Sequence, residues 1–167
     1  MSAPGNAANL DPADAELAAQ EAELVFESFT NDDGIALGLA LLETARTRQL
    51  VVTIDVRRGD QQVFHAALPG TSADNDAWVE RKVRVVRRLE QSSFRVGCAL
   101  RRTGRTIDEA YLIDGSLYGA HGGAFPITVR GAGVIGVVTI SGLAQREDHE
   151  LVVEVLRRTL TRQRSQA

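Results

Sequence analysis

Cysteine, aromatic residues and long apolar runs are all scarce in this chain of 167 residues. The single cysteine, Cys98, excludes an internal disulfide. The longest apolar runs, 35–42 and 134–140, are far shorter than the roughly 20 residues that a membrane helix needs. The first residues lack the basic start and the apolar stretch of a secretory signal. These absences predict a cytoplasmic protein without a membrane partner.

Positive charge is not in excess, because 19 basic residues stand against 22 acidic ones, for a net charge of -3. Nonspecific binding to nucleic acid needs a positive surplus, so we expect no nucleic-acid partner. Lysine is nearly absent, since 18 of the basic residues are arginine and only Lys82 is lysine. We interpret this arginine preference as a compositional bias rather than as guanidinium chemistry at one site.

The remaining composition fits one globular domain. Hydrophobic residues make up 44% of the chain, which is enough for a sizeable core at this length. Residues 1–10 are small, polar and unpatterned, and predict a disordered tail. We expect the domain over residues 11–162 and a second short tail over 163–167.

Apolar periodicity and turn residues predict the elements of this domain. Helices are expected over 11–30, 34–48, 76–91, 93–100 and 145–162, and strands over 50–57, 61–67, 125–130 and 134–141. A polar loop is expected over 101–108 and a weak strand-like segment over 111–120. This order predicts an α+β fold in which helices cover an antiparallel sheet.

Two of the expected helices carry more apolar surface than one chain of this size readily covers. Leu24 and Phe26 lie outside the main apolar stripe of the first helix, and helix 34–48 is apolar around almost its whole circumference. A subunit interface would cover both surfaces. The pattern therefore predicts a homo-oligomer, at least a dimer, with a pocket near a subunit boundary.

A glycine-rich string, Gly131-Ala-Gly133-Val-Ile-Gly136, has the letters of a dinucleotide-binding loop. That loop must open a helix, whereas β-branched residues follow here and favour a strand. The string therefore predicts a hairpin turn.

Three histidines, His65, His121 and His149, are candidates for metal binding or proton transfer. His121 precedes Gly122 and Gly123, whose missing side chains allow a ligand or a second backbone to approach closely. None of the histidines has the spacing of a recognised metal motif.

The start of the last expected helix is a second candidate region. Asp148 and His149 lie in its first turn, after Ser141 and Gly142, where free N–H groups favour an anion. We predict that His121, Gly122, Gly123, Ser141, Gly142 and His149 come together. A zinc or iron site built from His121, Asp148 and His149 stays an alternative.

The arginine-rich helix 76–91 offers a third candidate. Its charged side is typical of a solvated helix face. A functional alternative is that Arg81 and Lys82, next to the Asp74–Asn75 loop, clamp a carboxylate or phosphate ligand.

Many short strings occur in the order seen in one known family. They are 64–71, 74–75, 81–82, 92–93, 121–126, 134–137, 141–143 and 148–149, together with Trp78. Over roughly 17–160 the chain resembles the cytosolic branch of the heme-degrading-domain superfamily, which is related to the HbpS and GlcG proteins.

This resemblance implies a profilin-like α/β/α sandwich with a five-stranded antiparallel sheet flanked by helices. It also implies symmetric assemblies and, for some relatives, heme binding. The candidate axial ligands here would be His65, His121 or Cys98.

Residues and resemblance together predict a cytosolic oligomer that binds heme or another small anionic ligand. The expected ligand-binding residues are His65, Asn75, Arg81, Lys82, His121, Gly122, Gly123, Ser141 and Gly142. The alternatives are a metal-dependent enzyme using His121 and His149 with Asp148, or a stress-associated interaction scaffold. The residues do not decide whether catalysis occurs.

Overall fold

The structure is a computed structural model that describes residues 11–166. Its elements in chain order are α1 (Asp14–Glu23), β1 (Val25–Phe26), α2 (Asn31–Thr47), β2 (Thr53–Arg58), β3 (Gln61–Ala67), α3 (Ala73–Leu89), α4 (Ser93–Thr103), α5 (Ile107–Tyr111), β4 (Ala124–Val129), β5 (Gly133–Ser141) and α6 (Gln145–Gln166). The predicted tail 1–10 lies outside the described residues. The predicted tail at 163–167 is wrong in its extent, because α6 continues to Gln166.

The sheet has five strands in the order β1-β4-β5-β2-β3. The pairs β2–β3, β2–β5 and β4–β5 are antiparallel, and only the two-residue strand β1 runs parallel to its neighbour β4. The expectation of a five-stranded sheet flanked by helices is confirmed, with this one parallel pair as the difference. The glycine-rich string also forms the predicted hairpin turn between β4 and β5.

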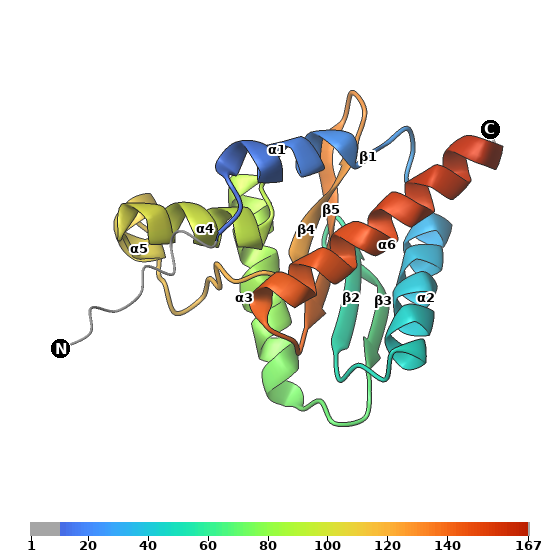
Figure 1. Ribbon diagram of the computed structural model, residues 1–167, viewed down its shortest axis with the longest axis horizontal. Coiled ribbons are helices and arrows are strands. Elements are labelled where there is room, and N and C mark those ends of the chain that lie inside the picture. The colour runs from blue at the N-terminus through green and yellow to red at the C-terminus, as the bar shows by residue number, and fades with distance from the viewer. Residues whose placement is uncertain (1–10, 167) are drawn as a thin grey trace.

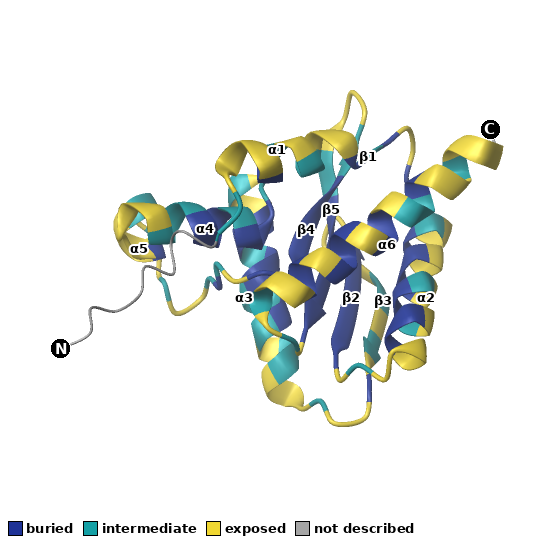
Figure 2. Cartoon of the chain, viewed as in Figure 1, coloured by how far each residue is buried: buried dark blue, intermediate teal, exposed yellow. Residues whose placement is uncertain are grey.

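Alternation along the strands divides the sheet into two faces. Ile54 and Ile140 belong to the large core shared with α2 and α6, while Val137 belongs to a smaller core with Val79 and Val83 of α3. Figure 1 shows α6 crossing the sheet beside α2. In Figure 2 the strands are mostly buried, and the outward sides of these helices are exposed. The architecture is therefore an α/β/α sandwich.

The first expected helix is wrong beyond Glu23, because the chain there turns into the core. Leu24 and Phe26 are each 1% exposed, and β1 pairs with the end of β4. These two residues are thus covered by their own chain, and they no longer support a subunit interface. Ile35 and Leu39 on α2 do remain exposed, at 40% and 53%.

The segment 101–120 also differs from its expected loop and weak strand. Gly104, in the left-handed conformation, ends α4, and Thr106 then forms a capping box with Glu109 that starts α5. This reciprocal capping explains why a helix forms in a polar stretch without apolar periodicity. Within the described part of the chain, no helix is both long and apolar enough to cross a membrane.

Candidate functional site

A pocket of about 380 Å³ opens where β5 ends, between the first turns of α3 and α6. Its lining residues are Asp74, Asn75, Trp78, Lys82, His121, Ser141, Gly142, Leu143, Gln145 and Asp148. Six of the predicted residues, Asn75, Lys82, His121, Ser141, Gly142 and Asp148, therefore lie at one site. The volume is within the roughly 300–1,000 Å³ usual for small-molecule pockets.

A buried ion pair lies on the inner wall of this pocket. Lys82 Nζ donates to the main-chain oxygen of Ile140 and to Oδ2 of Asp148, each at 3.0 Å. Lys82 is 4% exposed and Asp148 is 2% exposed. Lys82 lies on the buried side of α3, one helical turn after Trp78, so the helix directs both residues to the same pocket.

Burial changes the proton affinity of both partners. It lowers the pKa of the Lys82 ammonium, although the nearby Asp148 carboxylate acts in the opposite direction. It raises the pKa of the Asp148 carboxyl, against the effects of Lys82 and of two backbone N–H donors. Both shifts favour the neutral forms of the pair, so moving a proton from Lys82 to Asp148 costs less here than in water.

Asp148 and Asn75 hold the loop after β5 in place. Asp148 accepts hydrogen bonds from the backbone N–H groups of Gly142 at 3.3 Å and Leu143 at 3.0 Å. Asn75 accepts from Ser72 N at 3.0 Å and donates to the main-chain oxygen of Ser141 at 3.4 Å. The first turns of α3 and α6 are thus fixed around the pocket, and their partial positive charges favour an anion there.

Gly122 and Gly123 allow backbones, rather than a ligand, to approach. A Cβ on Gly122 would lie 1.9 Å from the main-chain oxygen of Gln145. Gly123 has a φ of +131°, and a Cβ there would lie 2.2 Å from the main-chain oxygen of Ile140 and 2.8 Å from Lys82 Nζ. Neither glycine lines the pocket. Their role in the site is to bring Lys82, β5 and α6 close together.

His121, Trp78 and Arg81 form a stacked group at the rim. The ring centroids of His121 and Trp78 are 5.0 Å apart, edge to face, and the Arg81 guanidinium carbon lies 4.1 Å above the Trp78 ring. Partial burial lowers the pKa of His121, and the positive charges of Lys82, Arg101 and Arg81 lower it further. The imidazole is therefore neutral at pH 7.

A second hollow of about 670 Å³ adjoins this rim, and it shares His121 and Gln145 with the first pocket. Arg81 lines it, and Arg81 Nε is buried without a hydrogen-bond partner among the described residues. Arg101 and Arg105 also line it, together with the acidic residues Asp108 and Asp114. His121 thus lies where two hollows meet.

His149 does not join this group, although it follows Asp148. Its ring lies against Phe94 and Phe125, with centroid separations of 4.8 and 5.9 Å, and its Nε2 is 2.8 Å from Oε1 of Gln20. Among residues 11–166, no group of three or more His, Cys, Asp or Glu could hold a metal ion. The proposed metal set of His121, Asp148 and His149 is therefore not assembled, because successive residues of α6 face different neighbours.

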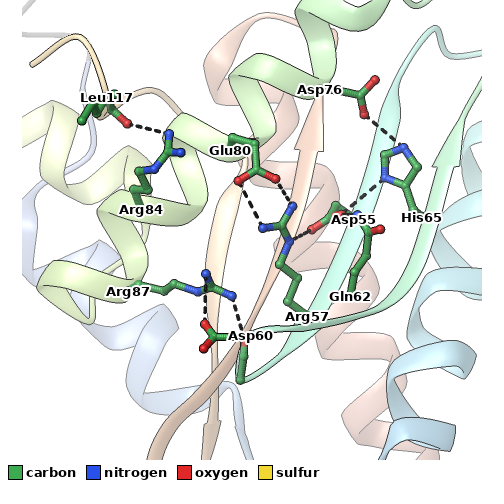
Figure 3. Close-up of polar contacts among 11 residues, drawn as sticks. Asp55, Arg57, Asp60, Gln62, His65, Asp76, Glu80, Arg84, Arg87 and Leu117 are labelled. Carbon is green, nitrogen blue, oxygen red and sulfur yellow. Dashed lines mark hydrogen bonds and ion pairs between the residues drawn. The ribbon is translucent and has the colours of Figure 1, made fainter.

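His65 lies in a separate polar cluster on the α3 side of the sheet (Figure 3). Its Nδ1 is 3.4 Å from Asp55 Oδ1 and its Nε2 is 3.0 Å from Asp76 Oδ1. Arg57 lies between Asp55 and Glu80 and contacts both carboxylates. His65 therefore contacts carboxylates rather than the pocket.

Comparison with known proteins places this architecture in a family. A family model described as haem degrading protein HbpS-like matches residues 29–157. The chain belongs to the HbpS-like family. A UPF0303 protein of Streptomyces avermitilis is 56% identical over 147 residues, which cover 88% of this chain and 90% of that protein. Another, from Paraburkholderia phytofirmans, is 46% identical over 140 residues, covering 84% and 85%.

Several solved structures share this fold. The crystal structure of Ybr137w protein matches with a TM-score of 0.84 and 29% identity, covering 90% of this chain and 89% of that one. HbpS matches at 0.62 with 17% identity, covering 79% and 89%. A PduOC:heme complex matches at 0.64 with 16% identity, covering 78% and 94%. HbpS and PduOC share the fold with this HbpS-like chain.

Sequence reasoning did not select Trp78 or Gln145 as site residues. Trp78 is the only tryptophan and lies four positions before Lys82, so helical spacing from Lys82 could have identified it. Gln145 has no comparable signal. Its role depends on the close approach of α6 to Gly122, where its Oε1 accepts from Gly122 N at 3.4 Å.

Proposed function

We propose that this HbpS-like chain binds a small anionic ligand in the pocket beside Lys82. The observation that carries the proposal is a nearly buried ammonium group lining a cavity. An ammonium has three N–H donors, and two acceptors, Ile140 O and Asp148 Oδ2, engage it. One donor remains for an oxygen of the ligand, and the first turns of α3 and α6 add positive potential around it.

Heme is the second candidate ligand, and His121 favours it. A neutral and partly exposed imidazole can ligate iron, and the second hollow offers volume and arginine side chains for carboxylates. His65 fits an axial role less well because both of its ring nitrogens face carboxylates. Cys98 does not fit, because it is fully buried and burial raises the pKa of its thiol. When bound, heme would supply iron-centred redox or ligand-binding chemistry.

Self-association and a cytoplasmic location complete the proposal. Ile35 and Leu39, one turn apart on α2, form an exposed apolar pair that a second copy could cover. The HbpS-like family is described as haem degrading, and PduOC is structurally similar and forms a complex with heme; both support a ligand-binding role without defining the ligand. Light scattering at micromolar concentration tests self-association, and a particle of 18.0 kDa would contradict it.

The single tryptophan is a built-in reporter for the anion test. Trp78 lines the pocket, so titration with inorganic phosphate and with succinate should quench or shift its fluorescence and saturate. Lys82→Met should weaken this response at least tenfold. Glu80→Gln lies on the same helix outside the pocket and should leave it unchanged. A wild-type response that never saturates would contradict the proposal.

Hemin titration tests the second candidate separately. We expect a saturable Soret shift in the wild-type protein and its loss in His121→Ala. The matched control is His65→Ala, which removes a histidine outside both hollows. Equal Soret shifts in all three proteins would exclude His121 as the ligand, and no saturable shift would exclude heme.

A further inference from the structure

Lys82 is the one lysine in a chain with 18 arginines, and it lines the pocket. Either residue supplies a positive charge, but only an amine can become a nucleophile at accessible pH. The one lysine thus occurs at a position where its side chain would contact a bound ligand. A structural reason also exists, because Gly123 approaches Nζ so closely that a compact ammonium fits better than a guanidinium.

We propose that Lys82 forms an imine with an aldehyde or ketone that also carries an anionic group. The proposal rests on the proposed anion-binding function and specifies its ligand class. Lys82 Nζ lies 3.0 Å from Asp148 Oδ2, so a proton acceptor is in direct contact with the amine. Asn75, His121 and Ser141 line the same cavity and offer polar groups for the rest of the ligand.

The reaction balances within the pocket. Lys82 transfers one proton to Asp148, and the neutral amine attacks the carbonyl carbon. Asp148 returns a proton to the carbonyl oxygen, which gives a carbinolamine. Asp148 then carries a proton from the nitrogen of this carbinolamine to its hydroxyl group, and loss of water leaves a protonated imine whose positive charge faces the Asp148 carboxylate. The net change is one carbonyl compound plus one ammonium giving one iminium and one water.

The environment of the pair supports the first step. Burial lowers the pKa of Lys82 and raises that of Asp148, which brings the proton affinities of amine and carboxylate closer together. An arginine in the position of Lys82 would keep the positive charge but could not form the imine.

Reductive trapping tests this inference directly. The full chain is incubated with pyridoxal 5′-phosphate and sodium cyanoborohydride, and the modified peptides are identified by mass spectrometry. The only primary amines are Lys82 and the N-terminal amino group, so each protein contains its own reference site. We expect labelling of Lys82 to saturate with reagent concentration, whereas N-terminal labelling should rise linearly. Pyridoxal without phosphate should label Lys82 at least tenfold less efficiently.

Two variants and one control separate chemistry from packing. Lys82→Arg keeps the charge and should lose the saturable adduct entirely. Asp148→Asn keeps the amine and should slow adduct formation at least tenfold. Glu80→Gln should label as the wild type does. Circular dichroism checks each fold, and if Lys82→Arg does not fold, Lys82→Met serves instead.

The outcomes distinguish the two proposals. If Lys82 is labelled no faster than the N-terminus while phosphate still saturates the Trp78 response, the imine is excluded and anion binding stands. If neither occurs, both proposals fail. Equal labelling rates in the wild type and Asp148→Asn would exclude Asp148 as the proton carrier.

Discussion

Helix α3 contributes to two ion pairs that differ in what surrounds them. Glu80 meets Arg57, which also donates to the fully buried Asp55, and Asp55 accepts in addition from the amide of Gln62. Lys82, half a turn further along the helix, meets Asp148 beside a cavity. In the first group the guanidinium is engaged by two carboxylates (Figure 3). In the second the ammonium has one carboxylate and one main-chain oxygen as acceptors, and Lys82 lines the pocket.

The contrast separates a structural charge from one that is available to a ligand. Burial lowers the pKa of Arg57, but its hydrogen bonds with Glu80 and Asp55 outweigh this effect and raise it overall. For Lys82 burial outweighs the single carboxylate, and its pKa falls. The protein therefore stabilises the positive charge of Arg57 more completely than that of Lys82. An anionic ligand could supply the stabilisation that the Lys82 charge lacks.

The largest effect is expected from removing the central carboxylate of the first group. Asp55→Ala leaves the buried Arg57 with only the half-exposed Glu80, so the free energy of unfolding should fall by about 3–5 kcal/mol. Urea denaturation at pH 7 measures it. Asp60→Ala is the control, because Asp60 is a fully exposed partner of Arg87, and this change should leave stability unaltered. If Asp55→Ala lowered the free energy of unfolding no more than Asp60→Ala does, the cluster would have no structural role.

Next in size is a pH effect at His149, the buried neighbour of Asp148. Burial, with a smaller effect of Arg146, lowers the pKa of His149 from 6.5 to about 4. Since the unfolded chain takes up this proton first, the stabilisation is complete above about pH 6.5, falls progressively below that pH, and is lost once the pH has fallen through 4.

We expect the free energy of unfolding to be about 2 kcal/mol lower at pH 5 than at pH 7.5 because of this group. Urea denaturation of the wild type and of His149→Phe at both pH values isolates it from the carboxylates. Identical pH dependence in the two proteins would show that His149 is not buried as a neutral ring.

The same two regions show what the sequence could predict. The sequence identified two strands and a covering helix from the β-branched runs of β2 and β5 and the apolar stripe of α3. This was possible because the apolar pattern within one segment indicates which of its residues are buried. Asn75 and Lys82 of α3 and Ser141 and Gly142 at the end of β5 were also selected, from charge and glycine patterns, whereas Trp78 was not. The choice between Asp148 and His149 was not predictable, since it depends on which neighbour each successive residue of α6 meets.

A smaller effect should follow when both charges of the second pair are removed together. Lys82→Met alone leaves the Asp148 carboxylate buried without its cation, whereas adding Asp148→Asn removes that charge and can keep an acceptor for Gly142 and Leu143. We expect the double variant to lie about 1 kcal/mol below the wild type and above the single variant. Urea denaturation measures stability, and Trp78 fluorescence should show that phosphate binding is lost in both. A double variant less stable than the single one would mean that the two charges are not coupled.

The smallest effect is expected at the exposed end of the first group. The Glu80 side chain is 46% exposed, and Arg57 keeps its contact with the buried Asp55 when Glu80 is neutralised. Because solvent screens an exposed partner, Glu80→Gln should lower the free energy of unfolding by about 0.5 kcal/mol. Urea denaturation of Glu80→Gln and Asp55→Ala side by side gives the ratio of the two contributions. If the two variants lost the same free energy of unfolding, both carboxylates would stabilise Arg57 equally. The greater burial of Asp55 would then not make its ion pair the stronger one.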